Sequence, residues 1–209
     1  AIAGARAADV PEPDGYRLED YRAPTPATLQ GDRVIETQEA EKIWRSRIAS
    51  FVEGLPRPPR PPNLPEGTLW HDKPRANIPD SIWLPDTGYG KLAPSVADYF
   101  AKGLNKATRG DHARLIVLYC LADCWMSWNA AKRALSLGYS NVAWYRDGTD
   151  GWLAAGLPLS DVAPEPRPLE EPNAPSRPEL LIFMAWTGRR SWHLESHAQN
   201  QTIASRSGQ

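Results

Sequence analysis

The middle of the chain shows two patterns of apolar residues in succession. Residues 115–119 are continuously apolar, as expected of a parallel strand that is covered on both faces. Residues 127–138 place apolar side chains at helical spacing, between Ser127, which can cap the start of a helix, and Gly138, which can end it in the left-handed conformation. A short apolar run follows at residues 142–145. The pattern predicts a strand, a helix and a second parallel strand, joined by a right-handed crossover.

Two amphipathic segments, residues 37–46 and 96–104, predict two earlier helices. Both lie in proline-free parts of a chain that has 21 prolines, none of them between residues 26 and 56 or between residues 94 and 158. Proline fixes φ and removes a backbone donor, so helices and central strands belong in these stretches. We therefore expect an α/β domain of three layers with a mainly parallel central sheet over residues 34–160.

The two ends of the chain predict different structures. Residues 1–33 form an N-terminal extension in which Ala5, Arg6 and Ala7 have the small-x-small spacing of a signal-peptidase site, so we expect the remnant of a signal peptide. An arbitrary boundary with chance alanines is the alternative. Residues 161–209 are rich in proline and charge and end in a Ser/Arg/Gln-rich stretch, which predicts an irregular, disordered C-terminal tail.

The composition of the chain excludes several classes of function. The 24 Lys and Arg residues are balanced by 25 Asp and Glu residues, without the basic excess that binding to a nucleic-acid backbone requires. No apolar run is long enough to span a membrane. Two cysteines exclude a scaffold stapled by several disulfides and a closed four-cysteine zinc site.

Cys120 directly follows the predicted buried strand, at the edge of the sheet where open α/β folds bind ligands. The loop of residues 121–126 leads from it into the predicted helix. The N–H groups of a tight loop and the positive end of a helix dipole both favour a thiolate. We therefore expect a reactive cysteine that is presented to solvent; a small apolar residue completing a core strand is the alternative.

The residues around this cysteine follow a recognisable order: Tyr119-Cys120, Ser127, Ala130-Ala131, Leu135, Gly138-Tyr139, Asn141-Val142 and Gly151-Trp152. This order resembles the rhodanese pattern. Upstream, residues 78–85 are similar to the rhodanese stretch I-P-G-A-x-x-I-P. The resemblance implies a rhodanese-like fold and sulfurtransferase chemistry.

A second resemblance rests on three stretches, residues 120–133, 144–152 and 13–26. They are similar to the PQQ-dependent catabolism-associated CXXCW-motif proteins, which are rhodanese-like proteins of bacteria. This resemblance implies a periplasmic accessory of pyrroloquinoline-quinone-dependent alcohol oxidation, with proteins of that dehydrogenase system as partners. It implies no bound PQQ, and we predict no cofactor. The family label writes two residues between the cysteines, whereas this chain has three: Leu121, Ala122 and Asp123.

The loop departs from ordinary rhodaneses, in which it usually carries Gly and an Arg that holds an anionic sulfur donor. Here Asp123, Cys124, Trp125 and Met126 occupy the loop, which is one residue longer and has no Arg. We expect Asp123 to repel a divalent anion and to raise the thiol pKa. Efficient turnover of thiosulfate is therefore not expected. Outside the loop, Glu53 and Asn77 replace a common Asp and a common His of the fold.

Cys124 adds a second thiol. Cysteines four apart across a strand-to-helix turn can approach the Cα separation of ~4.4–6.8 Å that a disulfide needs. We expect Cys120 to attack a sulfur donor or a disulfide, and Cys124 to resolve the resulting persulfide or mixed disulfide. A static disulfide in an oxidising compartment is the alternative.

Two other classes of function stay open. Cys120, Cys124 and Met126 are soft ligands suited to Cu(I), with His71 or His112 available only if the fold brings them near. A non-catalytic interaction module could instead dock a partner on Trp125, the loop tryptophan that we expect to be exposed. The spacing of Trp128, Trp144 and Trp152 predicts core positions.

One more residue belongs to the predicted site. Asp150 lies in the segment that borders the pocket in the rhodanese fold. It can orient the loop by hydrogen bonding or make its own turn, and we favour the turn.

Overall fold

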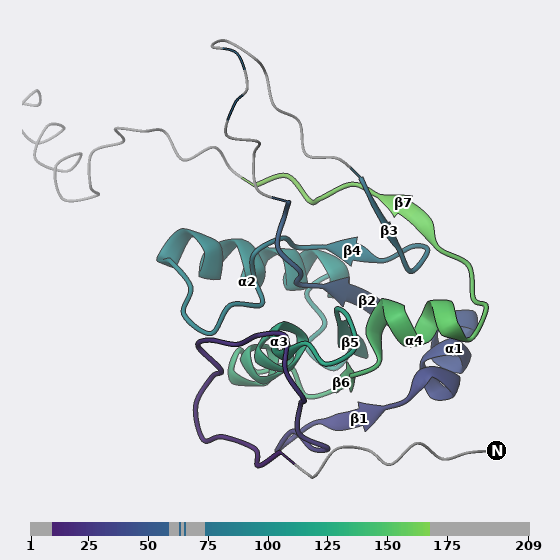
Figure 1. Ribbon diagram of the computed structural model, residues 1–209, viewed down its shortest axis with the longest axis horizontal. Helices are drawn as coiled ribbons and strands as arrows, with labels where there is room; N and C mark the ends of the chain where they lie inside the picture. Colours follow the sequence, from purple (N-terminus) through teal and green to yellow (C-terminus); the bar gives the residue numbers. More distant parts are fainter. Residues whose placement is uncertain (1–9, 59–62, 64, 66–73, 168–209) are drawn as a thin grey trace, which may run out of the picture. The chain divides into compact units, whose positions relative to one another are not determined.

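The computed structural model describes residues 10–58, 63, 65 and 74–167, and its centre is a parallel β-sheet (Figure 1). Within that part of the chain the sheet has five strands, in the order β1 (Arg33–Ile35), β6 (Val142–Tyr145), β5 (Ile116–Tyr119), β2 (Ser50–Glu53) and β4 (Ile82–Trp83). All four pairings are parallel. The predicted α/β fold with a mainly parallel sheet is confirmed.

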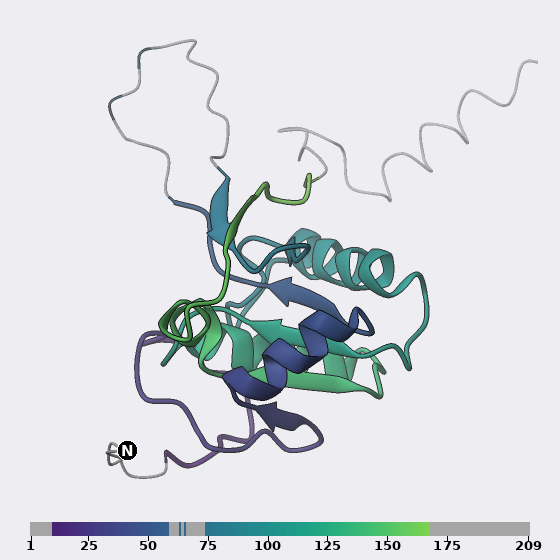
Figure 2. The ribbon, with the colours of Figure 1, turned by 90° about the vertical axis from the view of Figure 1, so that its right-hand side faces the viewer.

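Helices cover both faces of the sheet. On one face lie α1 (Thr37–Ser46) and α4 (Gly148–Ala154), and on the other α2 (Pro94–Thr108) and α3 (Trp125–Ser136) (Figures 1 and 2). Residues of β5 alternate between the two cores. Ile116 and Leu118 pack with α2 and α3, while Val117 and Tyr119 pack with α1 and α4. This alternation explains why the strand is apolar at every position.

A second, two-stranded sheet extends the domain beyond its expected end. In it β3 (Arg75–Asn77) pairs antiparallel with β7 (Ser160–Val162). The chain then forms a bridge between Pro164 and Trp83, and Arg167 donates a hydrogen bond to the carbonyl of Pro85. The tail predicted to start at residue 161 therefore packs on the domain as far as residue 167. Residues 168–209 lie outside the described part.

The N-terminal extension packs along α3. Residues 13–28, which we call the N-terminal strap, supply backbone carbonyls to side chains of that helix. Trp125 Nε1 donates to Pro24 (3.1 Å), Trp128 Nε1 to Thr28 (3.3 Å) and Lys132 Nζ to Pro13 (3.1 Å). The proposed signal-peptide remnant, Ala5 to Ala7, lies outside the described residues. Among those that are described, no helix combines the length and the apolar character needed to cross a bilayer.

Candidate functional site

The cysteine loop lies where the sequence places it, at the carboxyl edge of the sheet between β5 and α3. The helix, however, begins three residues earlier than a Ser127 cap would place it, at Trp125, with Cys124 as the residue that precedes it. Ser127 is therefore in the first turn and does not cap the helix. Its buried Oγ accepts hydrogen bonds from Cys120 Sγ (3.1 Å) and Trp144 Nε1 (3.0 Å), and donates to the carbonyl of Cys124 (3.2 Å). Ser127 thus fixes the cysteine loop against β6.

Both cysteines are buried, so the expectation that Cys120 is presented to solvent is wrong. Cys120 is 0% exposed and Cys124 is 1% exposed, and neither is in a disulfide. They form a small cluster with Met126, which is packed against partly buried neighbours: Tyr21, Leu55, Tyr89 and Leu121. Three of these neighbours come from segments remote in the sequence, which cover the loop only in the folded chain.

The pKa values of the two thiols move in opposite directions. Burial raises the pKa of Cys120 well above its usual range, and the neighbouring Cys124 adds to that shift. The pKa of Cys124 is lowered to about 6, first by the hydrogen bond from the Cys120 thiol and also by the backbone N–H groups of Met126 and Leu121, against an opposing contribution from burial. The expected thiolate is therefore placed on Cys124, which precedes the N-terminus of α3, and Cys120 is its donor.

An arginine from the N-terminal strap faces Cys124. Arg22 forms an antiparallel β-bridge with Cys124, and the adjacent Trp125 N–H donates to the carbonyl of Tyr21 (2.9 Å). The positive charge of Arg22 lowers the pKa of Cys124. The side chain of Arg22 is exposed, and it makes no ion pair with any described residue. Arg22 therefore provides a positive charge beside Cys124 from outside the loop. Asp123, within the loop, is exposed and has a left-handed φ of 48°.

Helix α4 anchors the loop from the other side. The Thr149 N–H donates to the carbonyl of Cys120 (2.9 Å), and Asp150 Oδ2 accepts from the Ala122 N–H (3.1 Å). Asp150 therefore orients the loop from the first turn of a helix, rather than making a turn of its own. Gly148, at a φ of 55°, lets the two segments approach, because a Cβ there would lie 2.3 Å from the Cys120 carbonyl oxygen.

Trp125 is covered rather than exposed, which corrects the predicted docking residue. It is 2% exposed and lies under the N-terminal strap, where the Arg17 guanidinium stacks 5.2 Å from its ring. The other three tryptophans of the prediction, Trp128, Trp144 and Trp152, are fully buried as expected. A partner protein that docks on Trp125 would have to displace the strap first.

A buried ion pair beside the loop escapes sequence analysis. Glu53, at the end of β2, accepts hydrogen bonds from Arg75 Nε (2.9 and 3.1 Å) and from Asn77 Nδ2 (2.5 Å). Burial raises the pKa of Glu53 to about 7, although Arg75 and Asn77 oppose that shift. The sequence signal that could have indicated this site is Glu53 itself, a carboxylate at the end of an apolar strand. Nothing in the sequence connects Arg75 with Glu53, which lies 22 residues before it.

The same network reaches the cysteine loop. Tyr119 donates its hydroxyl to Asn77 Oδ1 (2.6 Å), and Arg75 Nη2 donates to Thr149 Oγ1 (3.4 Å). Since Thr149 holds the carbonyl of Cys120, the ion pair supports the loop through one intermediate residue. Hydrogen bonds therefore connect the Glu53–Arg75 pair with the backbone of Cys120.

The structure brings together the three sulfur ligands of the proposed Cu(I) site, but it places no described histidine beside them. Cys120, Cys124 and Met126 pack together, as that reading requires. His112 instead lies before the amino end of β5, stacked on Tyr139 at 4.3 Å, and His71 is outside the described residues. No group of three or more His, Cys, Asp or Glu side chains suited to a metal ion occurs in the described segments.

Comparisons with known proteins find a family model that matches part of the chain. Residues 71–155 match the family model for the rhodanese-like domain. No curated protein matches the chain. Similar solved structures include an uncharacterised protein from Saccharomyces cerevisiae (22% identity, 60% of this chain and 93% of that one, TM-score 0.38). A second is a polysulfide-sulfur transferase from Wolinella succinogenes (16% identity, 63% of this chain and 80% of that one, TM-score 0.40). A third is a 3-mercaptopyruvate sulfotransferase from Escherichia coli (14% identity, 59% of this chain and 44% of that one, TM-score 0.34).

Proposed function

The chain carries a rhodanese-like domain, and from that premise we propose that it transfers sulfane sulfur through a persulfide formed on Cys124. The observation that carries the proposal is the contact between the two buried cysteines, in which Cys120 Sγ lies 3.5 Å from the carbonyl oxygen of Cys124. Cys124 has a lowered pKa of about 6 and receives a hydrogen bond from Cys120, whose own pKa is raised. At neutral pH such a pair holds one thiolate and one thiol, which is the state that a sulfur acceptor needs.

The proposed cycle requires no external oxidant or reductant. The Cys124 thiolate attacks the outer sulfur of a donor persulfide, R–S–SH, whose S–S bond breaks, so that Cys124–S–SH forms and R–S⁻ leaves. An acceptor thiolate then attacks the outer sulfur of Cys124–S–SH, and the Cys124 thiolate leaves with the hydrogen bond from Cys120 restored. Because Cys124 is buried, a donor reaches it only when part of its cover, which includes Tyr21, Leu55, Tyr89 and Leu121, moves aside.

This order reverses the roles expected from the sequence, in which Cys120 attacks and Cys124 resolves. In the reversed order Cys120 first serves as a hydrogen-bond donor. It becomes the resolving thiol only if it attacks the inner sulfur of Cys124–S–SH, which forms a Cys120–Cys124 disulfide and releases HS⁻. That branch is the thiol–disulfide form of the same chemistry, and it needs an external dithiol to restore the pair.

Intact-protein mass spectrometry after incubation with a low-molecular-weight persulfide tests the proposal. We expect a mass increase of one sulfur atom in the wild type and in Cys120→Ser, and none in Cys124→Ser. Peptide mapping should place the added sulfur on Cys124. An adduct that forms on Cys120 at the wild-type rate in Cys124→Ser would refute the assignment.

Arg22 extends the proposal to the charge of the donor. Its exposed guanidinium lies opposite Cys124 in the β-bridge, so it can bind an anionic donor as the sulfur approaches. We expect Arg22→Gln to lower kcat/KM about tenfold for a carboxylate-bearing persulfide and much less for a neutral alkyl persulfide. The matched control is Arg109→Gln, an exposed arginine at the end of α2. Equal losses for both donors would remove Arg22 from the site.

The cellular role that we propose is that of a periplasmic accessory in PQQ-dependent alcohol oxidation. Its support is the sequence resemblance of residues 13–26, 120–133 and 144–152. Fractionation of cells that express the gene from its own locus tests the location, and the rate of alcohol oxidation in a deletion strain tests the role. A protein retained in the cytoplasm, or an unchanged oxidation rate, would contradict this part of the proposal.

A further inference from the structure

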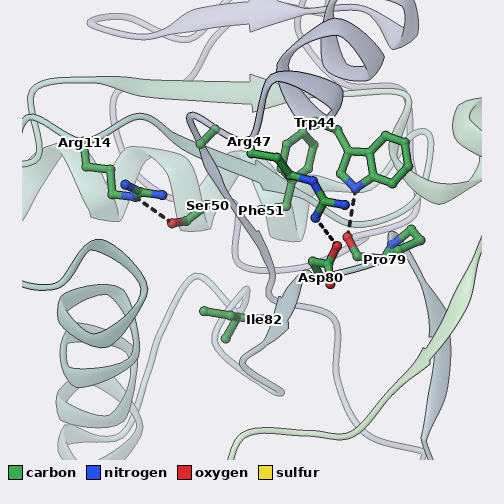
Figure 3. A pocket seen from close by; sticks show the side chains of 9 residues that line it. Trp44, Arg47, Ser50, Phe51, Pro79, Asp80, Ile82 and Arg114 are labelled. Carbon is green, nitrogen blue, oxygen red and sulfur yellow. Dashed lines mark hydrogen bonds and ion pairs between the residues drawn. The ribbon is translucent and has the colours of Figure 1, made fainter.

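A hollow of about 220 Å³ opens at the amino edge of the sheet, opposite the edge that carries the cysteines (Figure 3). It lies between the end of α1, the start of β2, the turn before β4 and the residues that precede β5. Arg114, which lines it, lies six residues before Cys120, a separation of about 20 Å along an extended strand. The hollow is therefore distinct from the cysteine site.

The acceptors around this hollow already have donors. Pro79 accepts from Trp44 Nε1 (2.9 Å), and Asp80 pairs with Arg47. Ser50 Oγ donates to the carbonyl of Ala107 (2.7 Å) and accepts from Arg114 Nε (3.2 Å). Because these acceptors are already paired, a ligand that donates hydrogen bonds would find few partners in the hollow.

The donors, in contrast, are in excess. Arg114 uses only Nε in contacts with described residues, so its two terminal nitrogens are available. Arg47 and Asp80 are each 65% exposed on their side chains, so their ion pair is accessible to exchange. Two arginines against one carboxylate leave the hollow with a positive charge, and Figure 3 shows the two guanidinium groups on either side of Ser50 and Phe51.

Apolar side chains form the rest of the lining. Phe51 and Ile82 line the hollow together with the two arginines, and the Trp44 ring is held in place by its hydrogen bond to Pro79. A doubly charged inorganic anion would make no use of these surfaces. A small molecule with a carboxylate at one end and a short hydrocarbon body at the other would satisfy both the terminal nitrogens of Arg114 and the apolar lining.

We propose that this hollow is a binding site for a small organic monocarboxylate, held by Arg114 and packed against Phe51, Ile82 and Trp44. The volume limits the ligand to a few carbon atoms. Arg47, which pairs with Asp80 and lies over the Trp44 ring (5.6 Å), adds positive charge beside the site. The site does not involve the cysteines, so binding at the hollow and sulfur transfer can be tested independently.

Titration of the full-length protein by ¹H–¹⁵N NMR tests the site, with sodium butyrate as the probe and constant ionic strength. We expect saturable shifts of the Trp44 indole and Phe51 amide signals, weaker binding of acetate, and no binding of butyramide, which has the same shape without the charge. Arg114→Gln should weaken butyrate binding at least tenfold. Lys42→Gln, which removes an exposed charge from α1 outside the hollow, should leave it unchanged.

Arg114→Lys keeps the charge but loses the two-pronged contact, so an intermediate affinity is expected and the test does not depend on one variant. The spectrum of each variant away from the hollow reports whether it is folded. Butyramide binding equal to that of butyrate, equal affinities of Arg114→Gln and Lys42→Gln, sulfate binding tighter than butyrate, or the absence of saturable shifts would each overturn the proposal.

Discussion

The pKa values of Cys120 and Cys124 differ because burial raises that of Cys120, whereas a side-chain hydrogen bond from Cys120 lowers that of Cys124. The side chain of Cys120 stabilises negative charge on Cys124. Cys120 itself is fully buried, so no solvent stabilises a thiolate on it, and its Sγ also lies within hydrogen-bond distance of Ser127 Oγ (3.1 Å). The two residues have the same chemistry in the sequence, and the structure makes them a donor and an acceptor. Their acidity is therefore a property of the pair.

Replacing Cys120 tests this pairing at the residue scale. In Cys120→Ala the hydrogen bond to Cys124 is lost, so we expect the pKa of Cys124 to rise from about 6 by more than about one unit. The rate of iodoacetamide alkylation against pH gives the midpoint. Cys120→Ser, whose hydroxyl can still donate, is the matched control and should give a smaller rise. An unchanged midpoint in Cys120→Ala would show that Cys120 does not stabilise the thiolate.

Glu53 gives a second residue-scale prediction, which concerns stability. A folded pKa of about 7 against an ordinary value of 4.5 means that the folded state keeps a proton which the unfolded state has lost, so this residue's contribution to stability falls as pH rises between those values. Glu53→Gln does not titrate. We therefore expect its free energy of unfolding, relative to wild type, to increase by at most about 3 kcal/mol between about pH 5 and pH 8.

Urea unfolding at the two pH values measures that change. Glu39→Gln, on the exposed surface of α1, serves as the control and should show no comparable trend. If the difference between Glu53→Gln and wild type is the same at both pH values, Glu53 is ionised throughout and the Arg75 ion pair dominates its environment.

At the scale of elements, the approach of α4 to the cysteine loop depends on a residue without a side chain. Gly148 and Gly156 both have positive φ, 55° and 72°, but only Gly148 has a neighbour at the position of a Cβ. Alanine at either position lowers the free energy of unfolding by about 1 kcal/mol, because a side chain disfavours the left-handed backbone conformation. Alanine at Gly148 also collides with the Cys120 carbonyl.

We expect Gly148→Ala to lower the free energy of unfolding by at least about 2 kcal/mol more than Gly156→Ala. It should also change the alkylation rate of Cys124, because the loop must shift to make room for the methyl group. Thermal or urea unfolding gives the first quantity. Equal destabilisation by the two substitutions would mean that α4 does not constrain the loop.

At the scale of the whole molecule, the N-terminal strap is part of the folded domain. Asn129, fully buried on α3, accepts from the Arg17 N–H (2.9 Å) and donates to the carbonyls of Arg17 (2.9 Å) and Gly88 (3.0 Å). It therefore joins the strap, the helix and the segment after β4. The strap in turn covers Trp125 and places Arg22 beside Cys124.

Removing this junction should loosen the strap. We expect Asn129→Ala to cost about 2–3 kcal/mol, because three hydrogen bonds are lost and buried backbone groups are left without partners. Asn105→Ala, at an exposed position of α2, should change stability by less than about 0.5 kcal/mol. Hydrogen exchange should show faster exchange of the Trp125 amide in Asn129→Ala. If that amide stays protected, the strap is held by its other contacts.

The sequence by itself determined the strand, loop and helix around Cys120. The unbroken apolar run of β5 and the helical spacing of α3 are local patterns, which can be recognised in the sequence without knowledge of the fold. The same patterns indicated the parallel α/β architecture. They did not fix the start of α3, because Cys124 precedes the helix without a capping side chain and Ser127 makes hydrogen bonds that only β6 and the cysteines provide.

Only the tertiary structure decided which cysteine is acidic, that Trp125 is covered, and that Arg22, Glu53 and Arg75 surround the loop. Exposure and pKa depend on which groups lie within a few ångströms, and here those groups come from the strap, from β2 and from β3. Contacts between segments so far apart along the chain leave no periodic trace in the sequence. The residues of the site could therefore be named in advance, whereas their protonation and their partners follow from the packing of remote segments.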